Sequence, residues 1–342
     1  MNLKNLSATI KIPKLLRDKL YIRKIEQIYK KFERSLDINE DFLVAVSGGP
    51  DSMALAFLAK IYSIKHNLKS KFIIVDHKLR PESTKEAKLV KNILKRYLIN
   101  SEILTWRGKK PHKNIQSLAR NKRYNLLFAQ SDKLKINNIL LGHHKDDLFE
   151  NFFIRILRGS GLKGLISFDK KIKIGNKNLL RPLLNQKKKD LLYLSKKVFD
   201  FYVEDPTNNN EEYQRIRVRN LIKKLGEDGL NEKKFIKTIK NLKSSNIVID
   251  FYVEQNLLKN TYFNNKKNQL ILNEIFFQQP YEVIFRALSE SIRLIGKKYY
   301  SVRGRKLDRI ILNIQNNKFF KVTLGRCVIE RVNQTVIISK EL

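Results

Sequence analysis

The chain has 342 residues, which exceeds the usual size of one domain, and 42% of them are hydrophobic, so we expect two or three domains that each bury a core. Lysine and arginine number 70 against 33 acidic residues, a formal net charge of +37. Such an excess repels itself in a compact fold unless a polyanion offsets it, which favours a nucleic acid partner. The alternative, a codon bias toward lysine, does not by itself explain acidic residues at half the basic count.

Two further features exclude classes of protein. No stretch reaches the roughly 18 uninterrupted apolar residues of a membrane span, and the first 20 residues lack the apolar block and cleavage site of a signal peptide. We therefore expect a cytoplasmic protein with no membrane partner. Cys327 is the single cysteine, which excludes a disulfide framework, a four-thiolate zinc site and any mechanism that needs a cysteine pair within this chain.

From Asp41 onward, short apolar runs alternate with longer segments of helical periodicity. Strands are predicted at 41–46, 71–77, 101–106 and 137–144, and helices at roughly 52–66, 82–98, 116–132 and 145–157. This alternation predicts the α/β class, with an open, mostly parallel sheet flanked by helices.

The domain prediction follows from where this pattern begins and ends. We expect an N-terminal extension at 1–40, an α/β domain at 41–220, a helical linker at 221–245 and a C-terminal domain at 246–342. The last region is predicted to be helical to about Tyr300 and then to form a β-hairpin within 319–339, because apolar and polar residues alternate there in two runs.

A glycine-rich loop follows the first predicted strand and opens a helix. It reads Ser47, Gly48, Gly49, Pro50, Asp51 and Ser52. Free backbone amides and the positive end of a helix converge in such a turn and make an anion site, while glycines let phosphate oxygens approach the backbone. Asp51 suits a Mg²⁺ ligand. The alternative is an ordinary turn that caps a helix, with Asp51 placed to favour its positive end.

The loop resembles the SGGxDS motif of the N-type ATP pyrophosphatases. That resemblance implies ATP as the nucleotide, Mg²⁺ as the metal, and adenylation of a carbonyl-like oxygen with release of pyrophosphate. The absence of a Gly-Lys-Ser/Thr ending separates the loop from the P-loop that holds a γ-phosphate. The motif indicates a reaction and leaves the substrate open.

Later segments resemble one family within this group, the tRNA(Ile)-lysidine synthetases. They lie at 75–83, 119–124, 142–150, 158–164, 181–184 and 204–208. The resemblance covers roughly 40 to 225. It departs from the family at Asn151 and, in a basic segment at 215–220, at Ile216 and Asn220, so any task of the replaced residues is in doubt.

Two pairs of polar residues fall near the expected sheet edge. Asp76 and His77 follow the second strand, where open parallel sheets bind ligands, and would contact ribose or base; Asp76 as a cap of the next turn is an equal alternative. Arg120 and Arg123 share a helical face and could contact phosphate or base. The alternative is that they form a solvated basic face.

Three acidic residues open the helix predicted at 145–157. Asp146, Asp147 and Glu150 lie off a predicted core stripe of Phe149, Phe152, Phe153 and Ile156. Clustered carboxylates at a strand's end suit Mg²⁺ or a cationic amine, although first-turn acids also stabilise a helix. His143 and His144 lack the cysteine cluster of most zinc sites, so for His143 we favour a phosphate contact or proton transfer.

The resemblance implies an ATP-binding catalytic domain at 41–220 and a tRNA-binding domain at 246–342. It also implies a role for each of these positions. ATP would contact the Ser47–Ser52 loop and Asp76, with Asp51 also the catalytic metal ligand and Arg120 and His143 catalytic. L-lysine would be bound by Asp147 and Glu150. The RNA-binding residues would be Arg80, Arg123, Arg215, Arg217 and Arg219.

The implied reaction attaches lysine to C2 of the wobble cytidine of tRNA(Ile) with a CAU anticodon, through an adenylated cytidine. A tRNA thiolase is disfavoured by the single cysteine, and a small-metabolite ligase needs no such charge excess. A non-catalytic RNA-binding protein would bind tRNA without converting ATP to AMP. Oligomeric state is undecided by the sequence, and a homodimer stays open.

Overall fold

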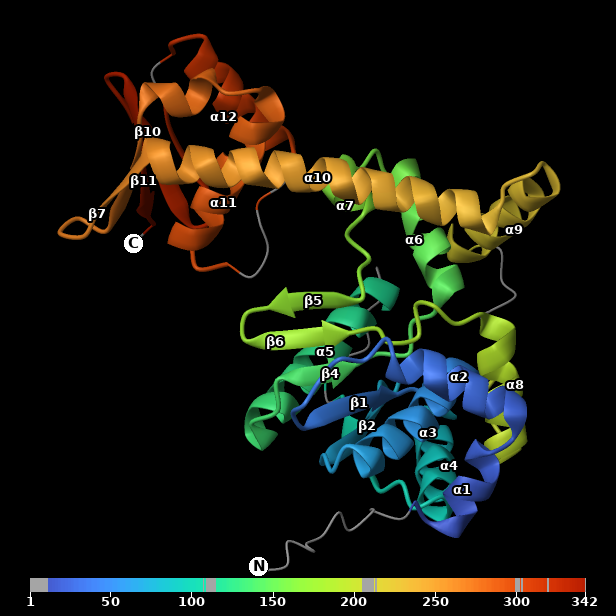
Figure 1. Cartoon of the computed structure of the whole chain (residues 1–342). Helices are drawn as coiled ribbons and strands as arrows, with labels where there is room; N and C mark the ends of the chain where they lie inside the picture. Colours follow the sequence, from blue (N-terminus) through green and yellow to red (C-terminus); the bar gives the residue numbers. More distant parts are fainter. Residues whose placement is uncertain are drawn as a thin grey trace, which may run out of the picture. The chain divides into compact units, whose positions relative to one another are not determined.

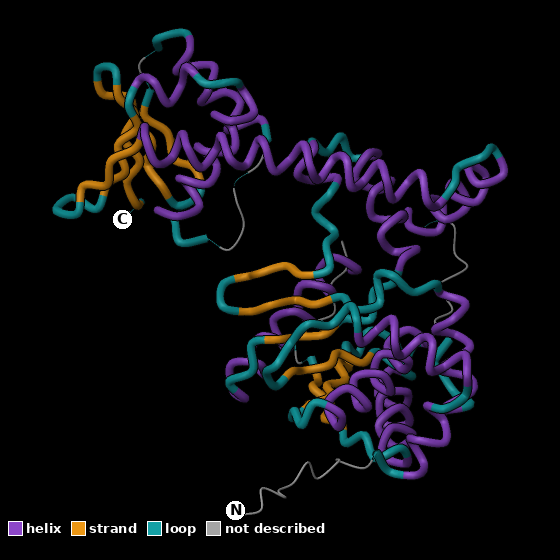
Figure 2. The backbone as a smooth tube through the Cα atoms, viewed as in Figure 1, coloured by secondary structure: helices purple, strands orange, loops and turns teal. Residues whose placement is uncertain are grey.

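The computed structural model describes residues 12–106, 108, 115–204, 212, 214–298, 302, 304–318 and 320–341. The chain divides into two compact units, Met1–Gly229 and Leu230–Leu342, and Figure 2 shows a separate group of strands in each. In the described residues, no helix is both long and apolar enough to cross a membrane. Of the family-like segment at 204–208, only Glu204 lies within the described residues.

The first unit is built on a six-stranded sheet in the order β3-β2-β1-β4-β6-β5 (Figure 1). Its strands are β1 Phe42–Val46, β2 Ser70–Asp76, β3 Ser101–Thr105, β4 Asn138–Leu140, β5 Lys171–Ile174 and β6 Lys177–Leu180. All neighbours pair parallel except β5 and β6. The predicted parallel α/β sheet is thus confirmed, and the antiparallel β5–β6 hairpin adds an edge that the sequence did not suggest.

Helices cover both faces of this sheet (Figure 1). The helices of the first unit are α1 Lys14–Leu20, α2 Arg23–Glu33, α3 Pro50–Lys65, α4 Ser83–Arg96, α5 Ile115–Leu134, α6 Lys145–Leu157, α7 Leu162–Leu165, α8 Lys188–Phe199 and α9 Gln214–Glu227, of which α6 packs against α7 and α9. Successive strand residues point to opposite faces. On β1, Val44 packs into one buried cluster and Leu43 into another, which explains why the strand reads as a continuous apolar run.

Three local predictions change in the structure. Within the predicted extension at 1–40, α1 and α2 are part of the first unit's core, since Leu16 and Phe32 are fully buried. The run at 137–144 is a strand only over Asn138–Leu140, because the chain then turns to cap α6. The predicted core stripe on α6 is confirmed at Phe152, which is buried, and was wrong at Ile156, which is 47% exposed.

The second unit combines helices with a five-stranded antiparallel sheet in the order β7-β8-β11-β10-β9. Its elements are α10 Glu232–Asn260, β7 Thr261–Asn264, β8 Gln269–Leu272, the 3₁₀ helix η2 Glu274–Gln278, α11 Tyr281–Ile295, α12 Arg305–Gln315, β9 Lys321–Leu324, β10 Cys327–Val332 and β11 Thr335–Lys340. The unit has its own core, in which α11 and α12 contribute Ile284, Leu288 and Ile311.

The predicted C-terminal region is α+β as expected, with two differences. The β7–β8 hairpin interrupts the region expected to be helical up to Tyr300, and the tail carries three strands where one hairpin was expected. The predicted linker at 221–245 covers the end of α9 and the first half of α10, and the boundary between the units falls inside it, at Gly229. The functional division of the chain stays a prediction.

Candidate active site

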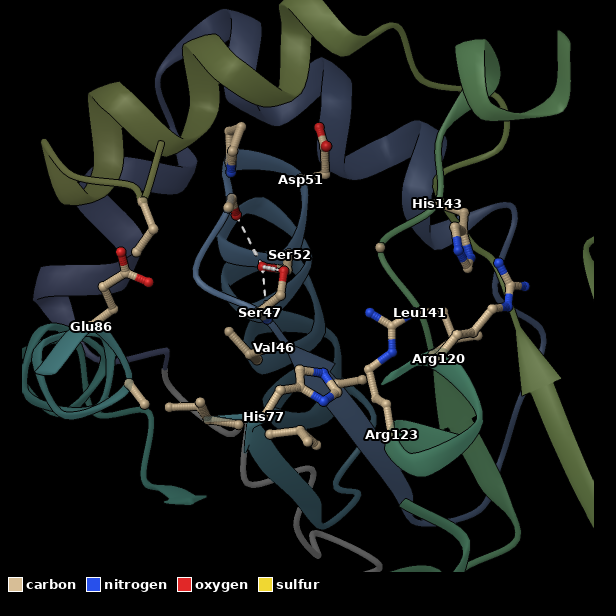
Figure 3. A pocket seen from close by; sticks show the side chains of 18 of the residues that line it. Val46, Ser47, Asp51, Ser52, His77, Glu86, Arg120, Arg123, Leu141 and His143 are labelled. Carbon is tan, nitrogen blue, oxygen red and sulfur yellow. Dashed lines mark hydrogen bonds between the residues drawn. The ribbon is translucent and has the colours of Figure 1, made fainter. Parts of the chain in front are cut away.

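A cavity of about 520 Å³ opens where β1, β2 and β4 end and α3, α4 and α6 begin. This is the carboxyl edge of the parallel strands, where open α/β sheets bind ligands. Figure 3 shows Ser47, Asp51 and Ser52 in one part of the wall and Arg120, Arg123 and His143 in another. The cavity therefore joins the predicted nucleotide loop to the predicted basic residues.

The Ser47–Ser52 loop is held in a fixed conformation by its own contacts. Ser52 Oγ accepts from the Ser47 amide at 3.1 Å and donates to the Gly49 carbonyl at 2.9 Å. Gly48 has a φ of +88°, and a Cβ there would come within 2.7 Å of Val90 Cγ2. At Gly142 a Cβ would lie 3.2 Å from the Ser52 amide nitrogen, so only glycine lets the β4 end approach the loop so closely.

Asp51 lies in the first turn of α3 and faces a second acidic residue. His144 Nε2 lies 3.5 Å from Asp51 Oδ2 and also 3.5 Å from Asp147 Oδ2. Burial raises the pKa of Asp51, and the charge of Asp147 acts in the same direction. His144 and Lys188 act to lower this pKa, but burial outweighs them. Asp51 Oδ1 is buried and has no hydrogen-bond partner, which is what a carboxylate oxygen reserved for a cation would show.

Asp76 is almost fully buried at the end of β2, with both oxygens engaged. Oδ1 accepts from the Lys78 amide at 2.9 Å and from Ser83 Oγ at 2.8 Å, and Oδ2 accepts from Thr84 Oγ1 at 2.6 Å. Burial acts to raise the pKa of Asp76, yet these hydrogen bonds outweigh it and the pKa is lowered. The carboxylate thus ties β2 to the start of α4, as the capping alternative requires, while the residue still lines the cavity.

A basic wall faces the loop. Arg120 and Arg123 both line the cavity from α5, as their spacing predicts, and stack over the ring of Tyr124 at 5.5 and 5.8 Å. Burial, followed by the charges of Arg181, Arg123, Arg120 and Arg215, lowers the pKa of His143 well below its ordinary range. His143 is therefore neutral at pH 7.

The two carboxylates predicted to bind lysine are buried, 8% exposed at Asp147 and 2% at Glu150. Arg215 and Arg219 of α9 pair with them: Arg215 Nη2 lies 3.3 Å from Asp147 Oδ1, Arg215 Nε lies 2.8 Å from Glu150 Oε2, and Arg219 Nε donates to Glu150 Oε1. Two residues predicted to bind RNA are thus neighbours of the predicted amine site.

The remaining predicted residues lie farther from this centre. Arg80 lines the cavity and forms an ion pair with Glu86 at 3.0 Å. Arg217 is exposed on α9 and donates to the backbone of Glu212 at 2.9 Å. The three basic positions of 215–220 therefore divide between two faces of one helix.

Sequence reasoning missed two residues of the cavity wall. His144 had been considered only as a zinc ligand, yet it caps α6 and contacts two carboxylates. Lys188, the first residue of α8, lines the cavity and acts electrostatically on Asp51. No sequence signal distinguishes it from the lysines on either side. Among the described residues, no group of three or more His, Cys, Asp or Glu side chains is arranged to hold a metal.

The chain is similar to a known protein family. A family model described as a PP-loop domain matches residues 18–225. The tRNA(Ile)-lysidine synthase of Orientia tsutsugamushi is 33% identical over 316 residues, covering 89% of this chain and 70% of the relative. That of the Wolbachia from Brugia malayi is 32% identical over 317 residues, with 89% and 71% covered.

The fold has a solved counterpart. A U34-tRNA thiolase from Methanococcus maripaludis, solved with its [4Fe-4S] cluster, superposes with a TM-score of 0.56 at 18% identity, covering 65% of this chain and 78% of the thiolase. At this identity the likeness concerns the fold alone. Fold and loop thus define a PP-loop protein. Within that class, the chain belongs to the tRNA(Ile)-lysidine synthase family.

Proposed function

We propose that this chain attaches L-lysine to C2 of the wobble cytidine of tRNA(Ile) with a CAU anticodon, converting ATP to AMP and pyrophosphate. As a member of its family it is an ATP-using ligase that modifies tRNA. One observation carries the finer proposal: a single cavity joins an anion-binding turn to the buried carboxylate of Asp147 and to the two arginines, Arg215 and Arg219, that pair with buried Glu150. A nucleotide and an amine could thus both bind close to the same cytidine.

The turn and its surroundings suit the polyphosphate of ATP. The start of α3 lines the cavity, so the positive end of this helix favours an anion there, and Lys188 adds a positive charge that acts on Asp51. Oδ1 of Asp51 has no hydrogen-bond partner and would suit a Mg²⁺ ligand. Bound there, the ion would offset charge on the departing pyrophosphate.

The reaction proceeds in two displacements. The cytidine O2 attacks the α-phosphorus, forming an O–P bond as the bond to pyrophosphate breaks. The ε-amine of lysine then attacks C2 and loses a proton, and AMP leaves with the oxygen. Arg120 and His143 face the adenylate from the basic wall, where donors fixed in advance stabilise developing negative charge.

Asp147 and Glu150 are proposed to hold the lysine. Both carry negative charge in a buried setting that Arg215 and Arg219 now neutralise. An incoming ammonium would share these carboxylates with the arginines. Sharing keeps both carboxylates paired throughout, which matters because an unpaired buried carboxylate is costly.

The activity is tested with ATP, labelled lysine and an unmodified tRNA(Ile) transcript. We expect label to enter the CAU transcript with stoichiometric AMP and pyrophosphate, and to be absent from a UAU transcript and from a methionine-specific tRNA. Tight tRNA binding without AMP formation would instead support the non-catalytic RNA-binding alternative. The single cysteine continues to argue against sulfur transfer.

The lysine site is tested separately. Asp147→Asn and Glu150→Gln should each raise the KM for lysine about tenfold or more, since a charge-assisted hydrogen bond contributes roughly 1.5–3 kcal/mol. Asp146→Asn is the matched control, because Asp146 opens the same helix but forms no ion pair with the described arginines of α9. Unchanged lysine affinity in the first two variants would contradict the assignment. We retain a homodimer as a proposal that sedimentation at several protein concentrations can test.

A further inference from the structure

Arg181, which follows β6 directly, is a buried arginine that has no assigned role. It is 3% exposed, and its guanidinium is held on three sides. Nε donates to His143 Nδ1 at 3.2 Å, Nη1 donates to the Asp169 carbonyl at 2.7 Å, and the group stacks over Phe168 at 4.5 Å. The His143 ring meets the same Phe168 edge-on, with centroids 5.2 Å apart.

This contact determines where the proton of His143 lies. A guanidinium only donates hydrogen bonds and stays charged in proteins, so the Nδ1 atom that it contacts must be the acceptor. A neutral imidazole carries one N–H, which must then be on Nε2. His143 lines the cavity. With Nδ1 engaged by Arg181, the ring nitrogen left for a ligand is Nε2, which is a hydrogen-bond donor.

We propose that Arg181 is a positioning residue that locks His143 as the neutral Nε2–H tautomer, so that His143 serves as a hydrogen-bond donor and not as a general base. The role in catalysis rests on the proposed function, whereas the tautomer is a property of the chain itself. The Nε2–H would donate to an oxygen of the adenylate phosphate. The proton released by the lysine amine would have to leave by another route.

The surroundings of His143 support a lasting neutral state. The charged side chains that act on it come from three elements and are all arginines: Arg181 after β6, Arg120 and Arg123 on α5, and Arg215 on α9. Burial comes first among the causes that lower its pKa, and these four charges act in the same direction. A positive charge on the imidazole is therefore opposed by each of these four arginines.

The first experiment uses the wild-type protein and needs no substrate. With ¹⁵N-labelled histidine, long-range ¹H–¹⁵N spectra report which ring nitrogen carries the proton, and His143→Asn assigns the signal among the chain's 5 histidines. We expect a protonated Nε2, an unprotonated Nδ1 and no titration between about pH 5 and 8. A protonated Nδ1, or a titration in the ordinary range of histidine, would overturn the proposal.

The second experiment removes the guanidinium. In Arg181→Met, the pKa of His143 should rise toward its ordinary range, and kcat should fall about tenfold or more. The pH profile of kcat should show an added decrease at acidic pH. The KM for lysine should not change. Arg181→Lys, which retains the charge, should keep His143 neutral. Arg286→Met, which removes a buried arginine of the second unit, should leave the His143 signal unchanged.

These outcomes separate the two proposals. If Arg181→Met leaves the titration of His143 as in the wild type, Arg181 has only a structural role and the inference fails. If Arg181→Met does not fold, the wild-type spectrum still decides the tautomer. If the chain makes no lysidine at all, the proposed function fails while the NMR result stands.

Discussion

Single charged groups in this protein take their roles from neighbours that are distant in sequence. Lys188 begins α8 and Asp51 lies in the first turn of α3, yet both line one cavity and interact electrostatically. Asp76 shows the opposite case, because all three of its side-chain partners lie within 8 residues. We therefore expect substitutions of Lys188 and of Asp76 to have different consequences.

For Lys188→Met we expect a KM for ATP raised about tenfold, because one charge-assisted contact to phosphate is lost. The KM for lysine should stay the same. Lys189→Met is the control, since Lys189 is exposed next to it and does not line the cavity. Steady-state kinetics with varied ATP measures the difference, and equal effects of the two substitutions would contradict a direct phosphate contact.

For Asp76→Asn we expect the free energy of unfolding to fall by about 1–3 kcal/mol at neutral pH, since three hydrogen bonds to a buried carboxylate are weakened. The folded pKa of Asp76 is lowered, so its stabilisation is present above the unfolded pKa of about 3.9 and is lost as the pH falls through the folded pKa. Urea unfolding from about pH 7 down to 3 should show the wild type and variant converging below about pH 4. A constant difference across this range would refute the contribution of the charge.

At the scale of elements, the strand–turn–helix formed by β1, the loop and α3 is the central feature of the site. The turn is tight because Gly48 adopts a conformation that other residues rarely take, and its carbonyl accepts from the Val203 amide at 2.9 Å. Gly49, in contrast, caps α3 with ordinary backbone angles, and a Cβ there would meet only Ser47 Oγ, at 3.9 Å. The two neighbouring glycines thus serve different purposes.

Gly48→Ala should lower the free energy of unfolding by about 1–3 kcal/mol, from the unfavourable backbone conformation and the clash with Val90. Gly49→Ala should leave stability within about 0.5 kcal/mol, and any effect should appear in the KM for ATP, because the added methyl would stand where phosphate approaches. Thermal and urea unfolding of both variants measure this. Equal destabilisation of the two would be inconsistent with the geometry of the turn.

At the scale of the whole molecule, charge is the dominant property. A net charge of +37 favours binding to RNA through phosphate contacts, which release counterions and depend on salt. The arginines of α9 indicate how this charge is divided. Arg215 and Arg219 neutralise buried carboxylates, whereas Arg217 is exposed on the helix surface.

The affinity for tRNA should fall at least about tenfold between 50 and 200 mM salt. Arg217→Met should reduce the slope of log Kd against log salt by about one and leave the KM for ATP unchanged, as for loss of one phosphate contact. Filter binding over a salt series provides the measurement. A slope near zero in the wild type would argue against a binding mode based on phosphate contacts.

Much of the fold and part of the site could be predicted from the sequence. The parallel strands, the loop at Ser47–Ser52 and the acidic helix start at Asp147 are marked by local patterns: apolar runs, a glycine turn and residue spacing. The β5–β6 and β7–β8 hairpins were missed because each of their strands has only 4 residues, although β5 does alternate lysine and isoleucine. The core role of α1 and α2 was missed because a helix's partner is not encoded in its own periodicity.

The sequence by itself determined the nucleotide loop, the α/β class and the basic character of the protein, because each depends on neighbouring residues or on composition. Only the tertiary structure decided which charges meet: that Arg215 and Arg219 pair with Asp147 and Glu150, that Lys188 faces Asp51, and that Arg181 contacts His143. The reason is physical. Electrostatic partners are set by distance and burial, and these arise when segments far apart in the chain pack together.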